Sequence, residues 1–234
     1  MSRAWKSLSV VPAELRLAVT LLNGQAFSWR RSGAATDEYV GVIGRHVFKL
    51  REDAKDCSWQ RVHPPAENAS DEEQAERQLR SFLNLGAAGL PSLSTLYADW
   101  SARDPDRFGR LATPFQGVRL LRQEPWECLV SFVCSSNNHI PRITSMLQSL
   151  RQRYGDKLCT VDGVDFFSFP DVERVADIKE QELRDLGFGY RAAYVTKTAA
   201  QVKAKGGEAA LLKCRTMPRY PLTTCVSVAA GRQA

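Results

Sequence analysis

The sequence predicts an α+β fold, with a twisted antiparallel β-sheet and helices on the N-terminal side and a purely helical, all-α region after it. Apolar and polar residues alternate in the first 62 residues, which is the period of strands with one buried face. After residue 117 the apolar residues recur every three to four positions, which is typical of amphipathic helices. We therefore expect an N-terminal sheet domain over residues 1–116, an incomplete helical domain over residues 117–213 and a divergent tail over residues 214–234.

Short strands separated by turn residues make up the predicted sheet. Asn23-Gly24 and Gly44-Arg45 are two-residue turn signals, and each is flanked by segments in which apolar residues alternate with polar or small ones. Two antiparallel strand pairs are therefore expected, one around each turn, and a further strand follows them. The expected strands cover residues 15–21, 25–29, 39–43, 47–50 and 57–62.

Helical patterns follow the strands. Ser70 and Glu73 have the spacing of a capping box, which predicts the start of a helix at this point. Further along, the polar residues 135–139 separate two apolar stripes, over 126–133 and 143–154, so a helix, a corner and a second helix are expected. The other expected helices cover residues 93–100, 179–186 and 191–205.

The charge pattern gives a first indication of a partner. The formal net charge is +6 at pH 7, and from Arg191 to the C-terminus there are eight basic residues against one acidic residue, Glu208. Positive charge concentrated on one part of a chain is typical of proteins that bind polyanions, although many basic surfaces are merely solvated. The pattern therefore leaves a nucleic-acid partner and a solvated basic surface both open.

The composition argues against membrane, metal and cofactor functions. No apolar run approaches the roughly 20 residues of a membrane span, and 44% hydrophobic residues are ordinary for a soluble protein. The six cysteines form no C-x-x-C pair and have no histidines nearby at zinc-finger spacing, so we expect reduced thiols. No membrane, metal or organic cofactor is expected.

Three stretches of the sequence together match the motifs of a known family. They are Asn23-Gly24-Gln25-Ala26-Phe27-Ser28-Trp29, the segment from Phe115-Gln116-Gly117-Val118-Arg119 to Cys134-Ser135-Ser136-Asn137-Asn138, and Leu186-Gly187-Phe188-Gly189-Tyr190-Arg191-Ala192. In this order and at this spacing, they resemble the N-terminal strand motif, the central helix and corner, and the wedge loop of 8-oxoguanine DNA glycosylases. The resemblance covers roughly residues 5–212.

The resemblance implies how the oxidised base is told from guanine. 8-Oxoguanine carries a proton on N7, where guanine has only an acceptor lone pair, so a backbone carbonyl oxygen can accept a hydrogen bond from the first base and not from the second. In the family a glycine of the strand motif supplies this carbonyl, and that glycine corresponds here to Gly24. The absence of a Cβ atom lets the backbone approach the base closely.

The resemblance also implies a set of DNA-binding residues. An enzyme that extrudes a base from a duplex must fill the vacated space and hold the orphaned partner base. By correspondence with the family, Asn137 fills the space, and Asn138 lies beside it in the DNA-binding corner. Arg142 and Arg191 are assigned to the N3 and O2 acceptors of the orphaned cytosine, and Tyr190 is assigned to a base step as a wedge.

Taken one at a time, these residues have less specific interpretations. Asparagines such as Asn137 and Asn138 often cap helices, and single arginines are usually solvated or bind phosphate. A lone tyrosine is usually a core or loop-anchor residue, and Gly24 alone is a turn glycine. The ordered set favours the DNA-binding interpretation. His139 and Pro141 depart from the family pattern, which usually has a third asparagine and an alanine at these positions.

The catalytic motif of the family does not occur in the sequence. Family members continue with a helix-hairpin-helix, Gly-Val-Gly-x-Lys, whose lysine attacks the sugar C1′, and then with an aspartate that stabilises the developing charge. Neither motif occurs in the 234 residues, and Lys203, Lys205 and Lys213 lie in the wrong context to replace the lysine. No catalytic residue is therefore assigned, and we expect the chain alone to be an inactive truncated form. The apolar stripes around Leu129 and Leu147 are expected to be left uncovered.

The activity that the resemblance implies is that of an N-glycosylase and AP lyase in base-excision repair. Its implied partner is double-stranded DNA with 8-oxoguanine opposite cytosine, bound by a monomer in the nucleus, with mitochondria as an open second location. Two other interpretations stay open: a catalytically inactive damaged-DNA-binding or interaction module, and an unrelated basic α+β protein. An in-frame Gly-Val-Gly-x-Lys motif downstream in the gene would favour the enzyme.

Overall fold

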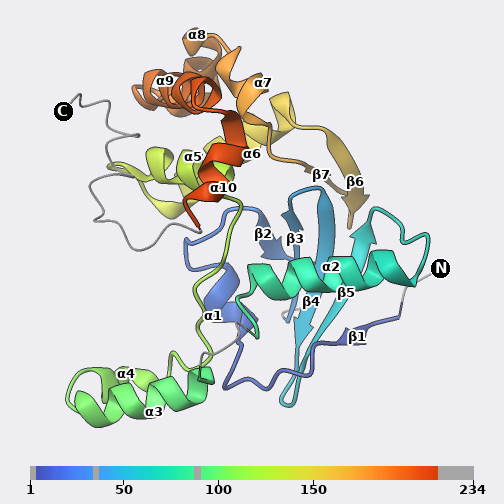
Figure 1. Cartoon of the computed structure of the whole chain (residues 1–234), viewed down its shortest axis with the longest axis vertical. Coiled ribbons are helices and arrows are strands. Elements are labelled where there is room, and N and C mark those ends of the chain that lie inside the picture. Colours follow the sequence, from blue (N-terminus) through green and yellow to red (C-terminus); the bar gives the residue numbers. More distant parts are fainter. Residues whose placement is uncertain (1–3, 34–36, 87–90, 216–234) are drawn as a thin grey trace. The chain divides into compact units, whose positions relative to one another are not determined.

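The computed structural model describes residues 4–33, 37–86 and 91–215 (Figure 1). The chain divides into two compact units, the first over residues 1–123 and 157–167, and the second over residues 124–156 and from 168 onwards. The division after Gln123 falls later than the boundary at residue 116 expected from the sequence, because residues 119–123 are hydrogen-bonded to the loop around Gln25. The α+β fold class is confirmed.

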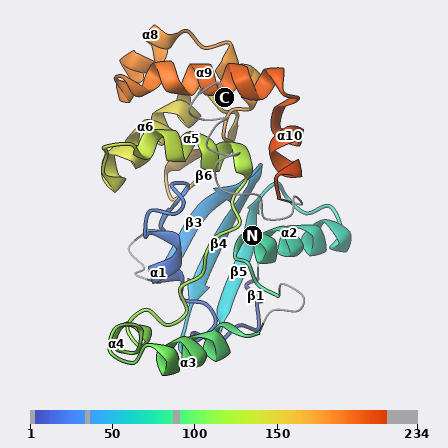
Figure 2. The same cartoon turned by 60° about the vertical axis from the view of Figure 1, so that its left-hand side comes forward.

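A five-stranded antiparallel sheet forms the centre of the first unit (Figure 2). Its strands are β1 (Lys6–Ser7), β2 (Trp29–Arg31), β3 (Glu38–Ile43), β4 (His46–Glu52) and β5 (Cys57–His63), in the order β1-β5-β4-β3-β2. Ile43 pairs with His46, so Gly44 and Arg45 alone form the turn, and Gly44 has a φ of +59° that glycine adopts without strain. The strands predicted over residues 39–43, 47–50 and 57–62 are confirmed.

The segment before the first predicted turn is a helix, and the strand predicted there is wrong: α1 spans Leu17–Leu21. Leu17 and Leu21 are fully buried, and residues four positions apart lie on one face of a helix. The Glu52 carboxylate accepts hydrogen bonds from the backbone amides of Leu17 (2.6 Å) and Ala18 (3.4 Å), which satisfies the helix N-terminus. A short apolar run suits either structure, and here a residue distant in sequence decides between them. Of the return strand predicted over residues 25–29, only Trp29 lies in a strand.

Helix α2 (Ala69–Phe82) lies along the sheet (Figure 1). The helix predicted after Ser70 is confirmed, and its apolar side packs into the core with the sheet through Ala75, Leu79, Phe82 and Leu83. The cap differs from the prediction: Asn68, and not Ser70, precedes the first turn, and the side chain of Asn68 accepts a hydrogen bond from the amide of Asp71 (3.0 Å).

Two short helices, α3 (Leu93–Arg103) and α4 (Phe108–Ala112), follow α2. Helix α3 confirms the helix predicted over residues 93–100. The rings of Tyr97, Trp100 and Phe108 are in mutual contact, with centroids 5.3 to 5.9 Å apart, and this aromatic cluster joins the two helices.

The hairpin of β6 (Lys157–Val161) and β7 (Val164–Phe167) lies in the region that the sequence predicted to be purely helical, and this prediction is wrong. Asp162 and Gly163 form its turn with φ values of +49° and +75°, and an Asp-Gly pair is a frequent signal for such a turn. The Asp162 carboxylate accepts hydrogen bonds from Ser32 Oγ (2.5 Å), directly after β2, and from Lys49 Nζ (3.2 Å) of β4, and these contacts hold the hairpin.

The second unit is helical in its described part, apart from loops. Its elements are α5 (Pro125–Ser135), α6 (Ile140–Tyr154), α7 (Val172–Ala176), α8 (Glu180–Leu183), the π-helical turn η1 (Arg184–Phe188), α9 (Arg191–Ala204) and α10 (Gly207–Lys213). The helices predicted over residues 126–133, 143–154 and 191–205 are confirmed, and the helix predicted over residues 179–186 is divided between α8 and η1. In neither unit do the described helices include one long and apolar enough to span a bilayer.

The buried faces of α5 and α6 differ partly from the expected ones. In α5 the buried apolar residues are Trp126, Val130 and Cys134, which recur every four positions, while Phe132 is 69% exposed. The side of α5 that carries Phe132 therefore faces away from the core. In α6 Leu147 is 1% exposed, so the expectation of an uncovered stripe around this residue is wrong.

Candidate functional site

The polar corner between α5 and α6 consists of residues 136–139. Asn137 has a φ of +46°, in the left-handed region that asparagine adopts more readily than most residues, and it is exposed. No hydrogen bond joins its side chain to the part of the chain that the structure describes. The amide of Asn137 is therefore presented to solvent at the turn between the two helices.

The side chain of Asn138 forms hydrogen bonds within the corner and stabilises its backbone. Its Nδ2 donates a hydrogen bond to the carbonyl oxygen of Cys134 (2.9 Å), and its Oδ1 accepts one from the backbone amide of His139 (3.0 Å). His139 in turn caps α6, because its Nδ1 accepts a hydrogen bond from the amide of Arg142 (3.4 Å). Pro141 lies in the first helical turn, where its missing N–H leaves no helical hydrogen bond unmade. Both departures from the family pattern thus fit the start of α6.

The loop before α9 brings Tyr190 to this corner. Gly187 and Gly189 have φ values of +87° and +57°, conformations that favour glycine, and Tyr190 follows them directly. The Tyr190 hydroxyl donates a hydrogen bond to the carbonyl oxygen of Ser136 (3.1 Å), while the residue is 47% exposed. The ring of Tyr194 meets it edge-on, with centroids 6.2 Å apart. Tyr190 is therefore a fixed and half-exposed aromatic ring.

Arg191 holds the corner in place. Its Nε and Nη2 donate hydrogen bonds to the carbonyl oxygen of Ser136 (3.1 and 2.5 Å), and Nη2 also donates one to the carbonyl oxygen of Asn137 (2.9 Å). Arg191 is 2% exposed, and its guanidinium carbon lies 4.5 Å from the centroid of the Tyr190 ring. The guanidinium thus joins α9, Tyr190 and the corner into one cluster.

Arg142 differs from Arg191 in its surroundings. It lies in the first turn of α6 and is exposed. Among the described residues, no acceptor binds its guanidinium group. Of the two arginines assigned to an orphaned base, only Arg142 therefore presents a guanidinium group to solvent.

The cysteines offer no reactive thiol at the corner. Burial raises the pKa of the Cys134 thiol to about 12, although the nearby charge of Arg191 acts in the opposite direction. This thiol is therefore protonated and unreactive at neutral pH. All cysteines in the described ranges are free, and within those ranges no three His, Cys, Asp or Glu side chains are grouped so that they could hold a metal ion.

The structure places Gly24 in the first unit, whereas the other predicted site residues lie in the second. Gly24 has a φ of +90°, and Asn23 Oδ1 accepts a hydrogen bond from the amide of Gln25 (3.1 Å), so the three residues form a tight turn. The carbonyl oxygen of Gly24 accepts no hydrogen bond from the residues that the structure describes. It is the type of acceptor that the sequence predicted at this position.

One central group of the corner was missed by the sequence analysis. The carbonyl oxygen of Ser136 accepts hydrogen bonds from both Tyr190 and Arg191, and it is the atom on which the cluster converges. Every residue carries a backbone carbonyl, so the sequence of Ser136 itself gives no signal for this role. The position of Ser136 within the corner motif of the family was the one available indication.

Comparison with known proteins identifies the family of this chain. Residues 7–129, more than half of the 234 residues, match the N-terminal domain of 8-oxoguanine DNA glycosylase. The chain belongs to the 8-oxoguanine DNA glycosylase family. Residues 130–232 match the HhH-GPD superfamily of base excision DNA repair proteins. This second match continues beyond Lys213, where the resemblance was expected to stop, into residues that lie mostly outside the described part.

Two curated members of the family are similar over most of this chain. An N-glycosylase/DNA lyase of Arabidopsis thaliana is 41% identical over 216 residues, which are 90% of this chain and 55% of the relative. An N-glycosylase/DNA lyase of Saccharomyces cerevisiae is 34% identical over 215 residues, 89% of this chain and 55% of the relative. The chain thus spans about half the length of the curated relatives that it matches.

The fold is that of solved 8-oxoguanine glycosylases. The Clostridium acetobutylicum 8-oxoguanine glycosylase/lyase, solved with double-stranded DNA that contains cytosine opposite 8-oxoguanine, superposes with a TM-score of 0.75. The superposition covers 93% of this chain and 68% of the bacterial one at 21% sequence identity. At this identity the likeness establishes the shared fold.

Proposed function

We propose that the chain recognises DNA with 8-oxoguanine opposite cytosine as part of a base-excision repair N-glycosylase and AP lyase. The observation that carries the proposal is the cluster at the corner, in which an exposed asparagine and a half-exposed tyrosine are fixed to each other through the backbone of Ser136. A protein that extrudes a base needs a rigid group to enter the duplex and a polar group to occupy the vacated space. Tyr190 and Asn137 suit these two roles.

Arg142 is our candidate for reading the orphaned cytosine. A guanidinium group can donate two parallel hydrogen bonds to the N3 and O2 acceptors of cytosine, whereas adenine would present an N6 donor to it. Because Nε and Nη2 of Arg191 are engaged by the corner carbonyls, Arg191 has only Nη1 left for a base. We therefore assign the direct contact mainly to Arg142 and a supporting contact to Arg191.

The expected partner is a DNA duplex, and the expected species is a monomer. We propose the nucleus as its location, since genomic DNA is the expected substrate, with mitochondria as an open second location. No residue of the 234 is assigned a catalytic role, so lesion recognition and not base removal is the function proposed for this chain alone.

The chain is expected to bind a duplex with an abasic-site analogue opposite cytosine about tenfold more tightly than the matching undamaged duplex. The analogue already has a vacant space and an unpaired cytosine, so the protein avoids an extrusion cost of roughly a few kcal/mol. Fluorescence anisotropy with labelled duplexes at two salt concentrations measures both affinities, and both should fall as salt rises.

Asn137→Gly is the matched variant for this measurement. Glycine accepts the φ of +46° without strain, so the turn is kept while the side chain is removed. We expect this variant to lose most of the preference for the abasic duplex. Equal affinities of the unaltered chain for the two duplexes would contradict the proposed function, and an unchanged preference in Asn137→Gly would contradict the role of Asn137.

Borohydride trapping on a duplex with 8-oxoguanine opposite cytosine is expected to give no covalent adduct with this chain. A Schiff base needs a lysine amine at the sugar C1′, and the 234 residues contain no Gly-Val-Gly-x-Lys motif. Lys203 is engaged in an ion pair with Asp177 (3.0 Å). The Clostridium acetobutylicum 8-oxoguanine glycosylase/lyase serves as the positive control. A trapped adduct would show that another lysine acts as the nucleophile and would overturn the assignment of no catalytic residue.

A further inference from the structure

The side chain of Gln25, directly after Gly24, pairs with the backbone of a distant segment as a neighbouring strand would. Its Nε2 donates a hydrogen bond to the carbonyl oxygen of Arg119 (2.9 Å), and its Oε1 accepts one from the amide of Leu121 (3.0 Å). One amide group thus bonds to two backbone groups that are two residues apart. This double contact fixes the position of the amide and, through it, the backbone of Gln25.

The backbone of Gln25 is held as well. Its amide donates to Asn23 Oδ1 (3.1 Å), and its carbonyl oxygen accepts a hydrogen bond from Gln123 Nε2 (2.7 Å). Each polar atom of Gln25 therefore has a hydrogen-bond partner within the first unit. The neighbouring carbonyl of Gly24 stays without a donor from the described residues, and the contacts around Gln25 limit the directions in which it can point.

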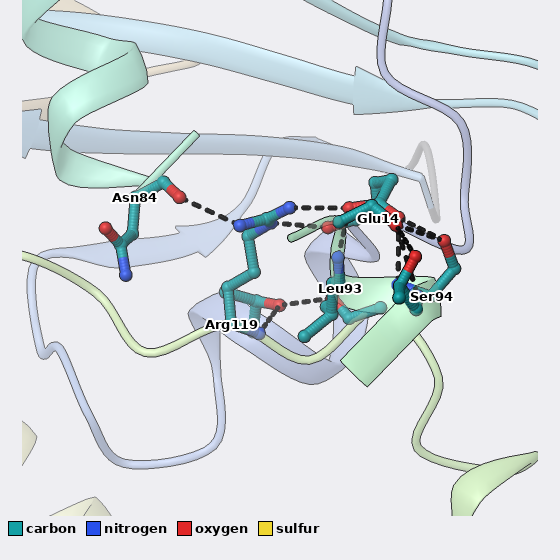
Figure 3. Close-up of polar contacts among 9 residues, drawn as sticks. Glu14, Asn84, Leu93, Ser94 and Arg119 are labelled. Carbon is teal, nitrogen blue, oxygen red and sulfur yellow. Dashed lines mark hydrogen bonds and ion pairs between the residues drawn. The ribbon is translucent and has the colours of Figure 1, made fainter. Parts of the chain in front are cut away.

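The segment 119–121, to which the Gln25 side chain is hydrogen-bonded, is itself held in place by the side chain of Arg119 (Figure 3). The guanidinium group of Arg119 donates to the Glu14 carboxylate (2.9 Å), to the Glu14 carbonyl oxygen (2.5 Å) and to the Asn84 carbonyl oxygen (2.8 Å). Arg119 therefore joins three parts of the first unit that are distant in sequence. Its own carbonyl oxygen, which binds Gln25, is fixed by the same contacts.

Glu14 completes the anchor. Its carboxylate accepts hydrogen bonds from the amides of Leu93 (2.8 Å) and Ser94 (2.9 Å) at the start of α3. Burial alone would raise the pKa of Glu14, but the hydrogen bonds from Ser94 and Leu93 and the charge of Arg119 outweigh it and hold the pKa below its usual value. The carboxylate is therefore ionised at neutral pH and can hold Arg119.

We propose that Gln25 is a positioning residue, which orients the carbonyl of Gly24 toward N7 of the extruded base and so sets the discrimination between 8-oxoguanine and guanine. This inference rests on the proposed function. A carbonyl oxygen attracts the N7 proton of 8-oxoguanine and repels the N7 lone pair of guanine, and both effects depend strongly on direction. A carbonyl that can rotate away from N7 loses this difference even when the loop stays folded.

The test compares the affinities of the whole chain for two duplexes that contain either 8-oxoguanine or guanine opposite cytosine. In Gln25→Ala we expect the ratio of the two dissociation constants to fall about tenfold, as for the loss of one or two neutral hydrogen bonds. Affinity for the guanine duplex should change little, because phosphate contacts dominate it. Gln74→Ala is the matched control, since Gln74 is an exposed glutamine of α2 in the same unit.

The variant Gln25→Glu tests separately the two hydrogen bonds of the side-chain amide, the one to Arg119 and the one from Leu121. Its carboxylate can still accept from the Leu121 amide, but it repels the Arg119 carbonyl oxygen, so we expect an intermediate ratio. Hydrogen exchange of residues 119–123 provides a readout without DNA and should rise in Gln25→Ala and not in Gln74→Ala.

The outcomes distinguish the inference from the proposed function. If the unaltered chain prefers the 8-oxoguanine duplex and Gln25→Ala keeps that preference, the positioning role is refuted while the proposed function stands. If the unaltered chain shows no preference, the proposed lesion recognition fails, and the role of Gln25 in it fails as well. A lost preference together with faster exchange only in Gln25→Ala supports the inference.

Discussion

Replacing Glu127 with alanine is expected to lower the free energy of unfolding of the second unit by about 3–5 kcal/mol, the usual cost of removing one partner of a buried ion pair. Glu127 of α5 and Arg151 of α6 form this pair, and their side chains are 13% and 7% exposed. The Arg151 guanidinium also lies over the ring of Phe169, 5.1 Å from its centroid. Without the carboxylate, the positive charge of Arg151 would stay buried and would lose this ion pair.

Urea-dependent hydrogen exchange on peptides of α5 and α6 measures this loss in the unit concerned. Glu180→Ala is the control, because Glu180 forms an exposed pair with Arg184, and such pairs contribute about 1 kcal/mol or less. The double variant Glu127→Leu with Arg151→Met should regain most of the stability, since it removes both charges. A loss in Glu127→Ala no larger than that in Glu180→Ala would show that the pair does not hold the two helices together.

This ion pair also supports the site. Glu127 lies near the start of α5 and Arg151 near the end of α6, while Arg191 holds the corner that joins the other ends of the two helices. The exposed side chain of Asn137 is therefore carried by a structure that is fixed at both ends. Such pre-organisation would favour the role proposed for Asn137, because each ordering step on binding costs affinity.

Local signals made much of the fold predictable. The pair Gly44-Arg45 specified its turn, and the polar run over residues 135–139 marked the corner, because in both cases neighbouring residues determine the backbone. The prediction failed where a distant residue decides the structure. Helix α1 depends on the carboxylate of Glu52. The cap of α2 was misplaced for a local reason, because Asn68 and Ser70, two positions apart, are both suitable N-cap residues.

The β6–β7 hairpin was missed although its signal was present. Asp162-Gly163 is a strong turn pair, but the helical periodicity on both sides of it favoured a continuous helical region. For the site, the family motifs pointed to Asn137, Tyr190 and Arg191, which the structure joins by hydrogen bonds at one corner, while their DNA-binding roles stay predictions. The burial of Arg191 could not be predicted, since its acceptors are backbone carbonyl oxygens that leave no mark in the sequence.

Arg142→Ala is expected to remove most of the preference for cytosine over adenine opposite an abasic-site analogue, a change of about 1–3 kcal/mol in the difference between the two binding free energies. This follows from the proposed contact of the exposed Arg142 guanidinium with the orphaned cytosine. Because the residue is exposed, the variant should keep the stability of the unaltered chain. Anisotropy titrations with each of the four bases opposite the analogue measure the effect.

Arg153→Ala is the control for charge. Arg153 is another exposed arginine of α6, about 16 Å along the helix from Arg142, so its removal should weaken binding opposite all four bases alike. Arg191→Ala should behave differently from both, because Arg191 is 2% exposed and binds the carbonyl oxygens of Ser136 and Asn137. We expect faster hydrogen exchange at residues 136–139 and weaker binding to every damaged duplex.

These three variants distinguish a direct contact with the orphaned base from a contact that only holds the corner in place. A base contact changes the ratio between opposite bases, a phosphate contact changes all affinities in proportion, and a clamp changes the exchange of the corner even without DNA. If Arg142→Ala weakened binding equally opposite all four bases, Arg142 would be a phosphate contact, and the assignment of the orphaned cytosine would pass to Nη1 of Arg191. If Arg191→Ala left the exchange of the corner unchanged, the hydrogen bonds to Ser136 and Asn137 would not be what orders it.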